Sequence, residues 1–248
     1  FFMIPFAFFT LFSGTISDAY DRRSTLLLGL GTYAVGSTLA ALSTSLEFFI
    51  VTRMIQGVGY AFVNPVLVAI LSDLSGPGRQ GRSMGYYGSA TTAGVSMGPL
   101  LGGAFAGIDW RIAFLVVTIL SLAMFASVWF AFRGEKKGTG KASLGAVKVQ
   151  LVRVAKERRT LYLSGAGFLA FMSFTGVISF VSEHLDTGPL SLTPEEIGIA
   201  LSASGIVGIF VAPVAGTLVD RRGPRCCVAV GLVASAAAAF ALQFAGSY

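Results

Sequence analysis

Charged side chains are scarce in this chain of 248 residues. Only 12% of its residues are charged and 54% are hydrophobic, whereas a soluble domain has about 25% charged residues. A soluble protein of this composition would have too little polar surface to cover its core. The shortage of charge therefore excludes a soluble globular domain and indicates a membrane protein.

Residues that build disulfides and metal centres are also few. The two cysteines, Cys226 and Cys227, are adjacent, so they provide neither a disulfide framework nor the spacing of a metal site. The single histidine, His184, lies with Glu183 and Asp186 in a segment that we expect to be an outer loop. These three residues could form a pH sensor or a metal site, but we favour the simpler interpretation that they are solvated.

The usual motifs of catalysis are missing as well. The sequence has no phosphate-binding loop, no cluster of metal ligands and no paired nucleophile and base. We therefore expect no enzyme, no cofactor and no bound metal.

Long apolar runs, by contrast, are abundant. A bilayer core of roughly 30 Å needs about 20 apolar residues in one helix, and the backbone in lipid must satisfy its own hydrogen bonds, so such runs are helices. The sequence predicts eight of them: 1–18, 25–43, 48–72, 83–106, 112–132, 161–182, 195–218 and 226–246. The expected fold class is an all-α membrane protein, a bundle of eight transmembrane helices.

Basic residues lie almost entirely in alternate connections between these spans. The connections 19–24, 73–82, 133–160 and 219–225 contain 16 of the 18 lysines and arginines, and the other three connections contain only Arg111. This asymmetry places the basic connections in the cytoplasm and both chain ends outside an inner (plasma) membrane. It also explains the net charge of +6 without nucleic-acid binding. Because the chain starts at Phe1 inside an apolar run, we expect one helix before it and more after Tyr248.

One connection is long and polar. Residues 133–160 begin with a flexible basic stretch, after which apolar residues repeat at helical spacing among lysines and arginines. This pattern predicts an amphipathic helix on the inner membrane surface, with a plain solvated linker as the alternative. We take this connection as the boundary between an N-terminal half, 1–132, and a partial C-terminal half, 161–248.

A short string occurs twice at the ends of apolar runs. Gly-Thr-Ile-Ser-Asp ends at Asp18 and Gly-Thr-Leu-Val-Asp ends at Asp220, 202 residues later, and clustered arginines follow each copy. A repeat of this length is typical of a membrane protein built from two similar halves, an architecture that is associated with alternating access.

Two further segments have unusual polar and small residues inside predicted spans. Arg53 is the only charge that must lie within a span; burial of an arginine is costly unless it is paired or hydrated, or unless it snorkels to the headgroups. We hypothesise that Arg53 takes part in proton coupling by tuning a buried acid, with Gln56 and Asn64 on the same helical face. No Asp or Glu lies deep in any of the eight spans, so that acid would lie in a helix outside this chain or near a mouth.

The second segment runs from residue 94 to residue 103. Gly94, Gly98 and Gly102 share one helical face, which predicts the close approach of another backbone. Pro99 cannot donate a hydrogen bond to the carbonyl at position 95, so we expect a bend there.

Together these motifs resemble the Major Facilitator Superfamily, and within it the drug:proton antiporter branch of twelve-helix exporters, over helices two to nine. The loop motif of that family, G-x-x-x-D-[RK]-x-G-[RK]-[RK], is matched in the first copy by Gly14, Asp18, Arg22 and Arg23, with departures at Ala19 and Asp21. The second copy is matched by Gly216, Asp220, Arg221, Gly223 and Arg225, with a departure at Pro224. The R-x-x-Q-G motif of the fourth helix is matched by Arg53, Gln56 and Gly57. The antiporter-associated G-x-x-x-G-P-x-x-G-G motif of the fifth helix is matched by Gly94, Gly98, Pro99, Gly102 and Gly103.

The resemblance implies two pseudo-symmetric halves that rock about a central small-molecule site, driven by the proton gradient in a monomer within the lipid bilayer. It also implies that the loop aspartate pairs with a cationic cluster and a helix N-terminus of the opposite half, which favours the outward-facing state. The departures at Ala19 and Asp21 weaken the first copy, so we expect the second loop to contribute more.

We therefore expect a proton-coupled exporter of drug-like or metabolite molecules. One alternative is proton-coupled uptake of a sugar or organic acid, although Phe132-Arg133-Gly134-Glu135 lacks the motif that sugar porters carry after their sixth helix. A second is a membrane scaffold or receptor without transport, and a third is a truncated, inactive product. Transport driven by an imposed pH gradient distinguishes these alternatives.

Overall fold

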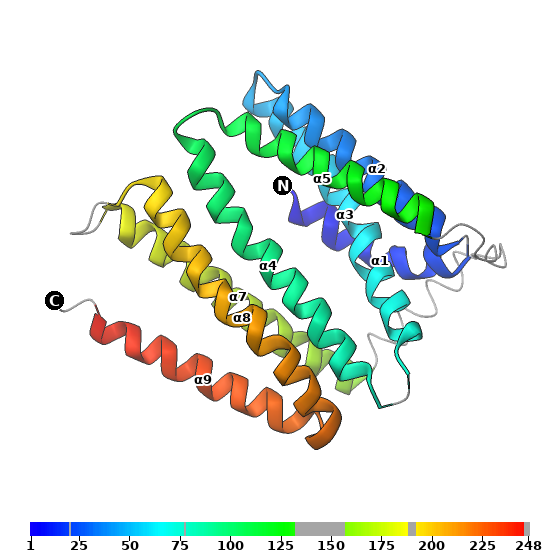
Figure 1. Ribbon diagram of the computed structural model, residues 1–248, viewed down its shortest axis with the longest axis vertical. Coiled ribbons are helices and arrows are strands. Elements are labelled where there is room, and N and C mark those ends of the chain that lie inside the picture. The colour runs from blue at the N-terminus through cyan, green and yellow to red at the C-terminus, as the bar shows by residue number, and fades with distance from the viewer. Residues whose placement is uncertain (20, 77, 132–156, 188–191, 246–248) are drawn as a thin grey trace. The chain divides into compact units, whose positions relative to one another are not determined.

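The computed structural model describes residues 1–19, 21–76, 78–131, 157–187 and 192–245. These residues form eight α-helices and no strand (Figure 1). The helices are α1 (Met3–Ala19), α2 (Arg22–Ala41), α3 (Leu46–Leu74), α4 (Gln80–Ala106), α5 (Trp110–Ala131), α7 (Arg158–Thr187), α8 (Pro194–Arg222) and α9 (Pro224–Ala245). Each coincides with one of the predicted spans, so the all-helical fold class is confirmed.

Five of the described helices contain a segment long and apolar enough to cross a membrane. They are α2, α3, α5, α8 and the segment Gly165–Glu183 of α7. The apolar parts of α1 and α9, Met3–Gly14 and Pro224–Ala238, are shorter. α4 is long, at 27 residues, but it is rich in glycine, serine and threonine, which lowers its hydropathy and suits it to packing against another helix.

The end of α7 differs from the sequence expectation. The helix continues to Thr187, so Glu183, His184 and Asp186 belong to its last turns and not to an outer loop. The loop interpretation is therefore wrong for these three residues, because the helix does not end at its last apolar residue. The predicted amphipathic helix and most of the linker 133–160 lie outside the described residues.

Contacts divide the chain into two compact units. Unit 1 comprises Phe1–Ile70 and Gly107–Gly167, and unit 2 comprises Leu71–Ala106 and Phe168–Tyr248. α4 thus groups with α8 and α9, although it lies in the N-terminal half of the sequence. The division into halves at residues 133–160 stays a prediction.

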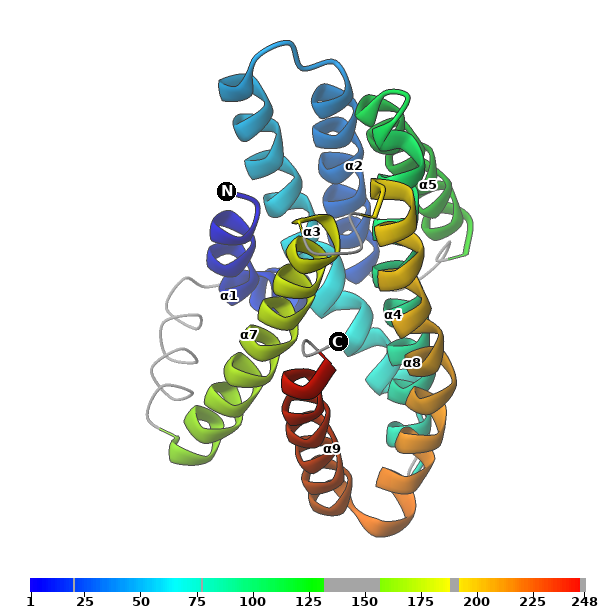
Figure 2. The ribbon, with the colours of Figure 1, turned by 90° about the vertical axis from the view of Figure 1, so that its left-hand side faces the viewer.

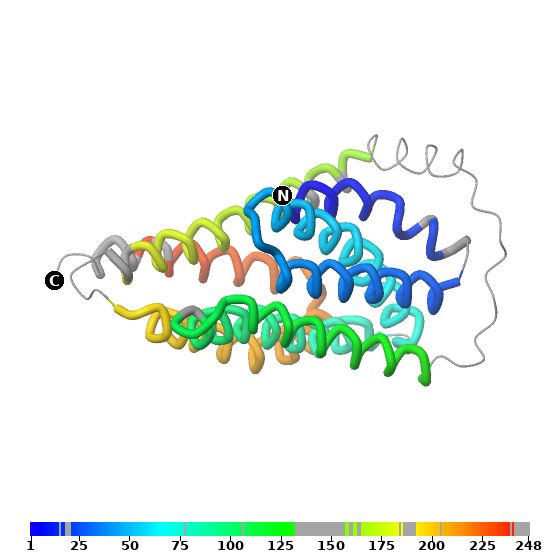
Figure 3. Tube along the Cα trace, turned by 90° about the horizontal axis from the view of Figure 1, so that it is seen from above, coloured from blue at the N-terminus to red at the C-terminus, as the bar shows by residue number. Residues whose placement is uncertain are grey.

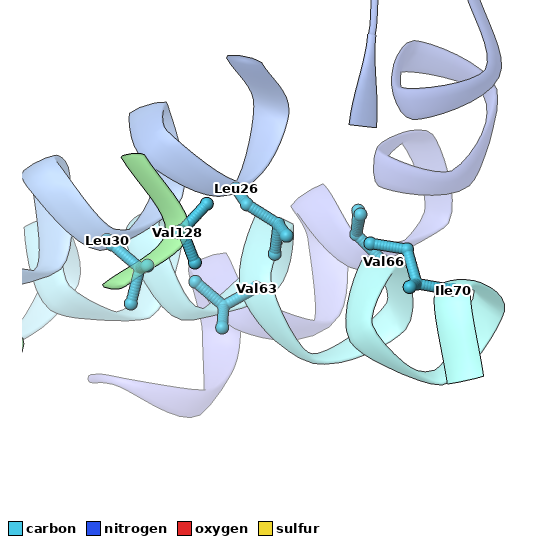
Figure 4. Close-up of a cluster of buried hydrophobic side chains, with 6 residues drawn as sticks. All are labelled: Leu26, Leu30, Val63, Val66, Ile70 and Val128. Atoms are coloured by element: carbon cyan, nitrogen blue, oxygen red, sulfur yellow. The ribbon is translucent and has the colours of Figure 1, made fainter. Parts of the chain in front are cut away.

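Unit 1 contains the hydrophobic core. Six buried side chains of α2, α3 and α5 pack together there: Leu26, Leu30, Val63, Val66, Ile70 and Val128 (Figure 4). Lipid gives little hydrophobic drive for helix association, so close packing of small residues matters. α2 and α3 meet at Gly29 and Gly59, where a Cβ on Gly29 would lie 2.9 Å from the Gly59 carbonyl oxygen. These two glycines bring the helices close enough for the core to form.

Unit 2 is built on the pairing of α4 with α8. The two helices run antiparallel and lie side by side along their length (Figure 1 and Figure 3). α8 begins with a capping box in which Thr193 and Glu196 bond each other's backbone, as is typical of a well-defined helix start. α9 follows α8 directly after Gly223, and α7 approaches the start of α8 through a bond from the Leu192 N–H to the Leu185 carbonyl, 2.9 Å long.

Candidate functional site

The last turn of α8 binds the first turn of α4 through one carboxylate. The Gly81 N–H donates to Asp220 Oδ1 at 2.7 Å, and the Arg82 N–H donates to Asp220 Oδ2 at 2.8 Å. The first N–H groups of a helix have no partner within the helix, and the helix dipole favours a negative charge there. Asp220, a residue of the predicted second loop motif, therefore caps a helix that is 138 residues distant from it in sequence.

Glycine is required on both sides of this contact. A Cβ on Gly81 would lie 2.5 Å from Asp220 Oδ1 and equally close to the Gly216 carbonyl oxygen. A Cβ on Gly216 would in turn meet the Gly81 carbonyl oxygen and lie 2.9 Å from the Gly85 Cα. Gly216, which the sequence predicted as a loop-motif residue, thus provides the space that lets Asp220 reach α4.

The rest of the second loop motif forms the turn between α8 and α9. Gly223 has a φ of 82°, a left-handed conformation that favours glycine, and it ends α8. Pro224 begins α9, where a missing N–H costs nothing. The Arg221 and Arg225 side chains are exposed, and the last turn of α8 contains Arg221 and Arg222, where cations complement the helix dipole.

From this cap, small residues extend along the whole contact between α4 and α8. We call this contact the α4–α8 seam; its closest points join Gly81 to Gly216, Gly85 to Ala212, Thr92 to Gly208, Ser96 to Gly205, Pro99 to Gly198, and Gly103 to Pro194. A Cβ on Gly198 would lie 2.6 Å from the Pro99 carbonyl oxygen, so the two backbones are in direct contact.

Two serine hydroxyls add hydrogen bonds across the α4–α8 seam. Ser89 Oγ donates to the Ile209 carbonyl at 2.5 Å, and Ser202 Oγ donates to the Ser96 carbonyl at 2.6 Å. Hydroxyls that bond across helices contribute modestly in lipid, about 0.6 kcal/mol each on average. The contact is thus smooth in shape, because it uses few side chains, and specific in register, because the hydroxyls have fixed partners.

Within unit 2, α8 packs on a face of α4 other than the predicted glycine face, and the close approach of another helix at Gly94, Gly98 and Gly102 stays a prediction. Within the described residues of unit 2, a Cβ on Gly94, Gly98 or Gly102 would meet nothing within 4 Å. Of the predicted antiporter string, only Pro99 and Gly103 contact α8. The seam lies roughly 120° around α4 from the predicted face, at 3.6 residues per turn. Gly81, Gly85, Ser89 and Ser202 were missed by sequence reasoning, although small residues at spacings of three and four from position 81 onward could have revealed this second face.

The second predicted site is in unit 1, around Arg53 on α3. The Arg53 Nη1 donates to Gln56 Oε1, and Gln56 Nε2 donates to Ser37 Oγ on α2 at 2.6 Å. Gln56 is fully buried, and its amide accepts from Arg53 and donates to Ser37, so Gln56 lies beside Arg53, as the shared helical face predicts. Asn64 lies further along α3 and is half-buried.

Aromatic rings enclose the guanidinium of Arg53. Its Cζ lies 5.1 Å from the centre of the Phe2 ring and 5.5 Å from that of Phe114. Cation–π contacts of this kind stabilise a partly desolvated arginine by about 0.5–2 kcal/mol each. Arg53 is therefore held by rings and an amide, and not simply extended toward the headgroups.

Gln56 is held in place by two residues of α2, Gly36 and Ser37. Sequence reasoning did not identify either of them. Ser37 is buried, and its hydroxyl oxygen accepts a hydrogen bond from the Gln56 amide. Gly36 leaves space for the Gln56 side chain, since a Cβ on Gly36 would lie 2.8 Å from Gln56 Cγ. A Gly-Ser pair in an apolar run gives little signal on its own, so only the fold connects it to Arg53.

The first copy of the loop motif is arranged differently from the second. Arg23 Nη2 donates to the Trp129 carbonyl at 3.0 Å and its Cζ lies 4.8 Å from the centre of the Trp129 ring, which joins the start of α2 to the end of α5. Asp21 caps α2, since its carboxylate accepts from the Ser24 N–H at 3.2 Å. Gly14 and Arg22 lie in α1 and at the start of α2, whereas the Asp18 side chain lies outside the described part of the structure, so its role stays a prediction.

Comparison with known proteins decides the family. The model of the Major Facilitator Superfamily matches residues 1–248, which is the entire chain. This chain belongs to the Major Facilitator Superfamily. The resemblance drawn from the sequence motifs is therefore confirmed, as is the prediction that the chain is not an enzyme. Membership of the superfamily and the apolar helices together make it a multi-pass membrane protein.

Relatives within the Major Facilitator Superfamily include resistance and export proteins. Multidrug resistance protein 2 of Bacillus subtilis (strain 168) is 23% identical over 92% of this chain and 58% of its own length. The tetracenomycin C resistance and export protein of Streptomyces glaucescens is 23% identical over 98% of this chain and 55% of its own length. The class G tetracycline resistance protein of Vibrio anguillarum is 29% identical over 94% of this chain and 60% of its own length. The chain thus spans somewhat more than half the length of these relatives.

The described part of this superfamily member contains no group of three or more His, Cys, Asp and Glu side chains that could hold a metal ion. What it contains instead is a backbone contact with a carboxylate at one end, in unit 2, and an aromatic-enclosed arginine in unit 1.

Proposed function

We propose that the protein to which this chain contributes is a secondary transporter that exports small molecules at the expense of a proton gradient, by alternating access. The α4–α8 seam is the observation that carries the proposal. It joins a helix of the N-terminal half of the sequence to a helix of the C-terminal half through backbone contacts, and such a smooth contact permits one helix to rock on the other. The names of the relatives, which include multidrug and tetracycline resistance proteins, favour export over uptake.

In this proposal Asp220 biases the equilibrium between the two states. Its two hydrogen bonds to the start of α4 exist only while the ends of α4 and α8 meet. A carboxylate at a helix N-terminus contributes about 0.3–1 kcal/mol when exposed and up to about 2 kcal/mol when partly buried. That magnitude shifts a two-state equilibrium without fixing it, as a transport cycle requires.

Arg53 serves proton coupling in the same proposal. Its guanidinium has a defined position between two rings and beside Gln56. Its positive charge is therefore fixed at one position in the helix bundle. A fixed positive charge lowers the pKa of a nearby acid and so helps a carboxylic acid of the complete protein to release its proton. We further propose that the protein acts as a monomer in the plasma membrane, with the basic connections in the cytoplasm.

Gradient-driven transport tests the proposal. The full-length protein is reconstituted in proteoliposomes, a pH gradient is imposed, and the movement of a fluorescent drug such as ethidium is followed. We expect uptake into proteoliposomes that are acidic inside, which stops when an ionophore collapses the gradient, and a loss of at least about tenfold in rate for Arg53→Ala. Flux that is indifferent to the gradient contradicts proton coupling, and a fully active Arg53→Ala variant contradicts the role of Arg53.

A further inference from the structure

Arg111 is the one basic residue of the connections that the charge asymmetry leaves unexplained. The three connections on its predicted side of the membrane contain no other lysine or arginine, as the depletion of positive charge there requires. Its Nη2 donates to the Ser43 carbonyl, just after the end of α2, at 2.9 Å, and its Cζ lies 5.1 Å from the centre of the exposed Trp110 ring. Because tryptophan is enriched at membrane interfaces, Arg111 lies at the level of lipid headgroups.

A pocket of about 290 Å³ lies beside this guanidinium; we call it the Arg111 pocket. Its walls are the connection between α2 and α3, the first turn of α3 and the start of α5, and they include the hydroxyl residues Ser43, Thr44 and Ser45. No acidic side chain of the described residues lines it; Asp109 accepts from the Arg111 backbone N–H at 2.9 Å without lining the pocket. One of the five guanidinium N–H groups bonds Ser43, so the others can bind an anion.

A second hollow follows the same helices toward their middle. α2 and α5 run antiparallel and side by side (Figure 1 and Figure 2), and the α2–α5 groove between them has a volume of about 380 Å³. Its lining is hydrocarbon except for Thr38 and Thr118, whose hydroxyls each bond a carbonyl of their own helix. Val35 and Leu122 line it and are exposed, so the groove is open on one side. It is therefore suited to a hydrocarbon chain.

The Arg111 pocket and the α2–α5 groove are connected by one stripe of α5. Arg111, Thr118, Leu122 and Phe125 belong to the two linings, and their spacing keeps them within about 60° around the helix. Along the axis, Thr118 lies about 10 Å and Phe125 about 21 Å from Arg111, at 1.5 Å per residue. One leaflet with its headgroups is about 20–22 Å thick, half of the whole bilayer. The groove thus lies at the depth of acyl chains below a headgroup at Arg111.

We propose that unit 1 binds one anionic phospholipid, with its phosphate at Arg111 and an acyl chain in the α2–α5 groove. Arginine binds phosphate oxygens through two parallel N–H bonds, and basic pockets between membrane helices bind acidic headgroups. Phosphatidylcholine is disfavoured, because the Arg111 pocket offers its choline no carboxylate. A free phosphate makes no use of the groove. This inference goes beyond export, and the proposed orientation of the chain places the lipid in the outer leaflet.

Site-resolved photolabelling tests the inference on the full-length protein in phosphatidylcholine nanodiscs. Phosphatidylglycerol with a diazirine in one acyl chain is added as a minor component, and labelled peptides are mapped by mass spectrometry. We expect labelling of residues 31–39 and 118–125 that excess phosphatidylglycerol removes and that soluble glycerol phosphate leaves unchanged. A photoreactive phosphatidylcholine should label these residues at least about fivefold less, which corresponds to about 1 kcal/mol.

Arginine variants test the position of the headgroup. Arg111→Ala should lower the labelling at least about fivefold, by the same conversion, and Arg111→Lys, which keeps the charge, should restore most of it. Arg23→Ala is the matched control, because Arg23 also bonds a carbonyl of the partner helix and stacks on a tryptophan, at the opposite end of the same pair. It should leave the labelling of the groove unchanged.

A further variant tests the groove without altering the charge. A Cβ on Gly31 would lie 3.7 Å from Phe125 Cε2, an ordinary contact, so Gly31→Leu should fill the groove, abolish the labelling and retain the melting temperature. Labelling that persists in both Arg111→Ala and Gly31→Leu, that falls equally in Arg23→Ala, or that the phosphatidylcholine probe reproduces would overturn the inference. Removal of the labelling by glycerol phosphate would show a site for free phosphate and overturn the lipid assignment. Because no pH gradient is applied, none of these outcomes depends on the proposed export.

Discussion

Replacing Asp220 by asparagine should loosen the first turn of α4. The carboxylate accepts from two backbone N–H groups, those of Gly81 and Arg82, at 2.7 and 2.8 Å. The amide of asparagine has only one oxygen, so its NH₂ group would face the second N–H. One of the two hydrogen bonds is therefore lost, because two donors face each other there. The other hydrogen bond remains, but its acceptor oxygen is no longer charged.

The size of this effect follows from the contacts that are lost. A hydrogen bond to a charged group contributes about 1.5–3 kcal/mol and a neutral one about 1 kcal/mol. Asp220 is exposed, and solvent weakens charged interactions at such positions. We therefore take the lower end, about 1–2 kcal/mol, which changes the population of the opened turn by about 5- to 30-fold.

Amide hydrogen exchange measures that population directly. The exchange of Gly81 and Arg82 should be faster in Asp220→Asn by about 5- to 30-fold, because one N–H group loses its acceptor and the other keeps only an uncharged one. Asp21→Asn is the matched control, since Asp21 caps α2 through the Ser24 N–H. It should accelerate exchange at Ser24 and leave residues 79–84 unchanged. Unaltered exchange at Gly81 in Asp220→Asn, or the same acceleration from Asp21→Asn, would refute the capping role.

Three further substitutions test the packing around the two sites. Gly85→Ala places a Cβ 2.8 Å from a carbonyl oxygen of α8, whereas Gly88→Ala places one at an ordinary 3.5 Å; thermal unfolding should show a loss of about 1–3 kcal/mol for the first and little change for the second. Gln56→Leu leaves Arg53 and Ser37 without their shared partner, and should destabilise the protein by about 1–3 kcal/mol; a variant as stable as the wild type would show that the buried amide is dispensable. Arg23→Ala removes the guanidinium stacked on an indole, so the tryptophan emission should change at this end of unit 1, and an unchanged spectrum would argue against the stack.

The sequence predicted the helices well because length and hydropathy mark most membrane helices, although α4 is less apolar than the five candidate spans. A run of about 20 apolar residues has no other stable form in lipid, so all eight helices were found within a few residues. α7 was underestimated, because polar residues such as Glu183 can extend a helix beyond its apolar part. The end of such a helix therefore cannot be located from the end of its apolar run.

The seam between α4 and α8 was predicted only in part. Repeated glycines drew attention to one face of α4, at Gly94, Gly98 and Gly102, but the structure brings α8 to a face of mixed glycine, serine and threonine. Both faces satisfy the spacing for close packing. Only the position of the partner helix, which depends on the whole of unit 2, decides between them.

The two copies of the loop motif depart from the family pattern at the points where each starts its next helix. In the first copy, Asp21 replaces a glycine and caps α2 with its carboxylate. In the second copy, the glycine is kept as Gly223 with a left-handed φ, and Pro224 begins α9 with a fixed φ that suits a first helical position. The departures at Asp21 and Pro224 thus exchange one way of starting a helix for another, and neither changes the aspartate that precedes it. Asp21 Oδ2 accepts from the Ser24 N–H and from the Ser24 hydroxyl, so the extra acid of the first loop has a local role in starting α2.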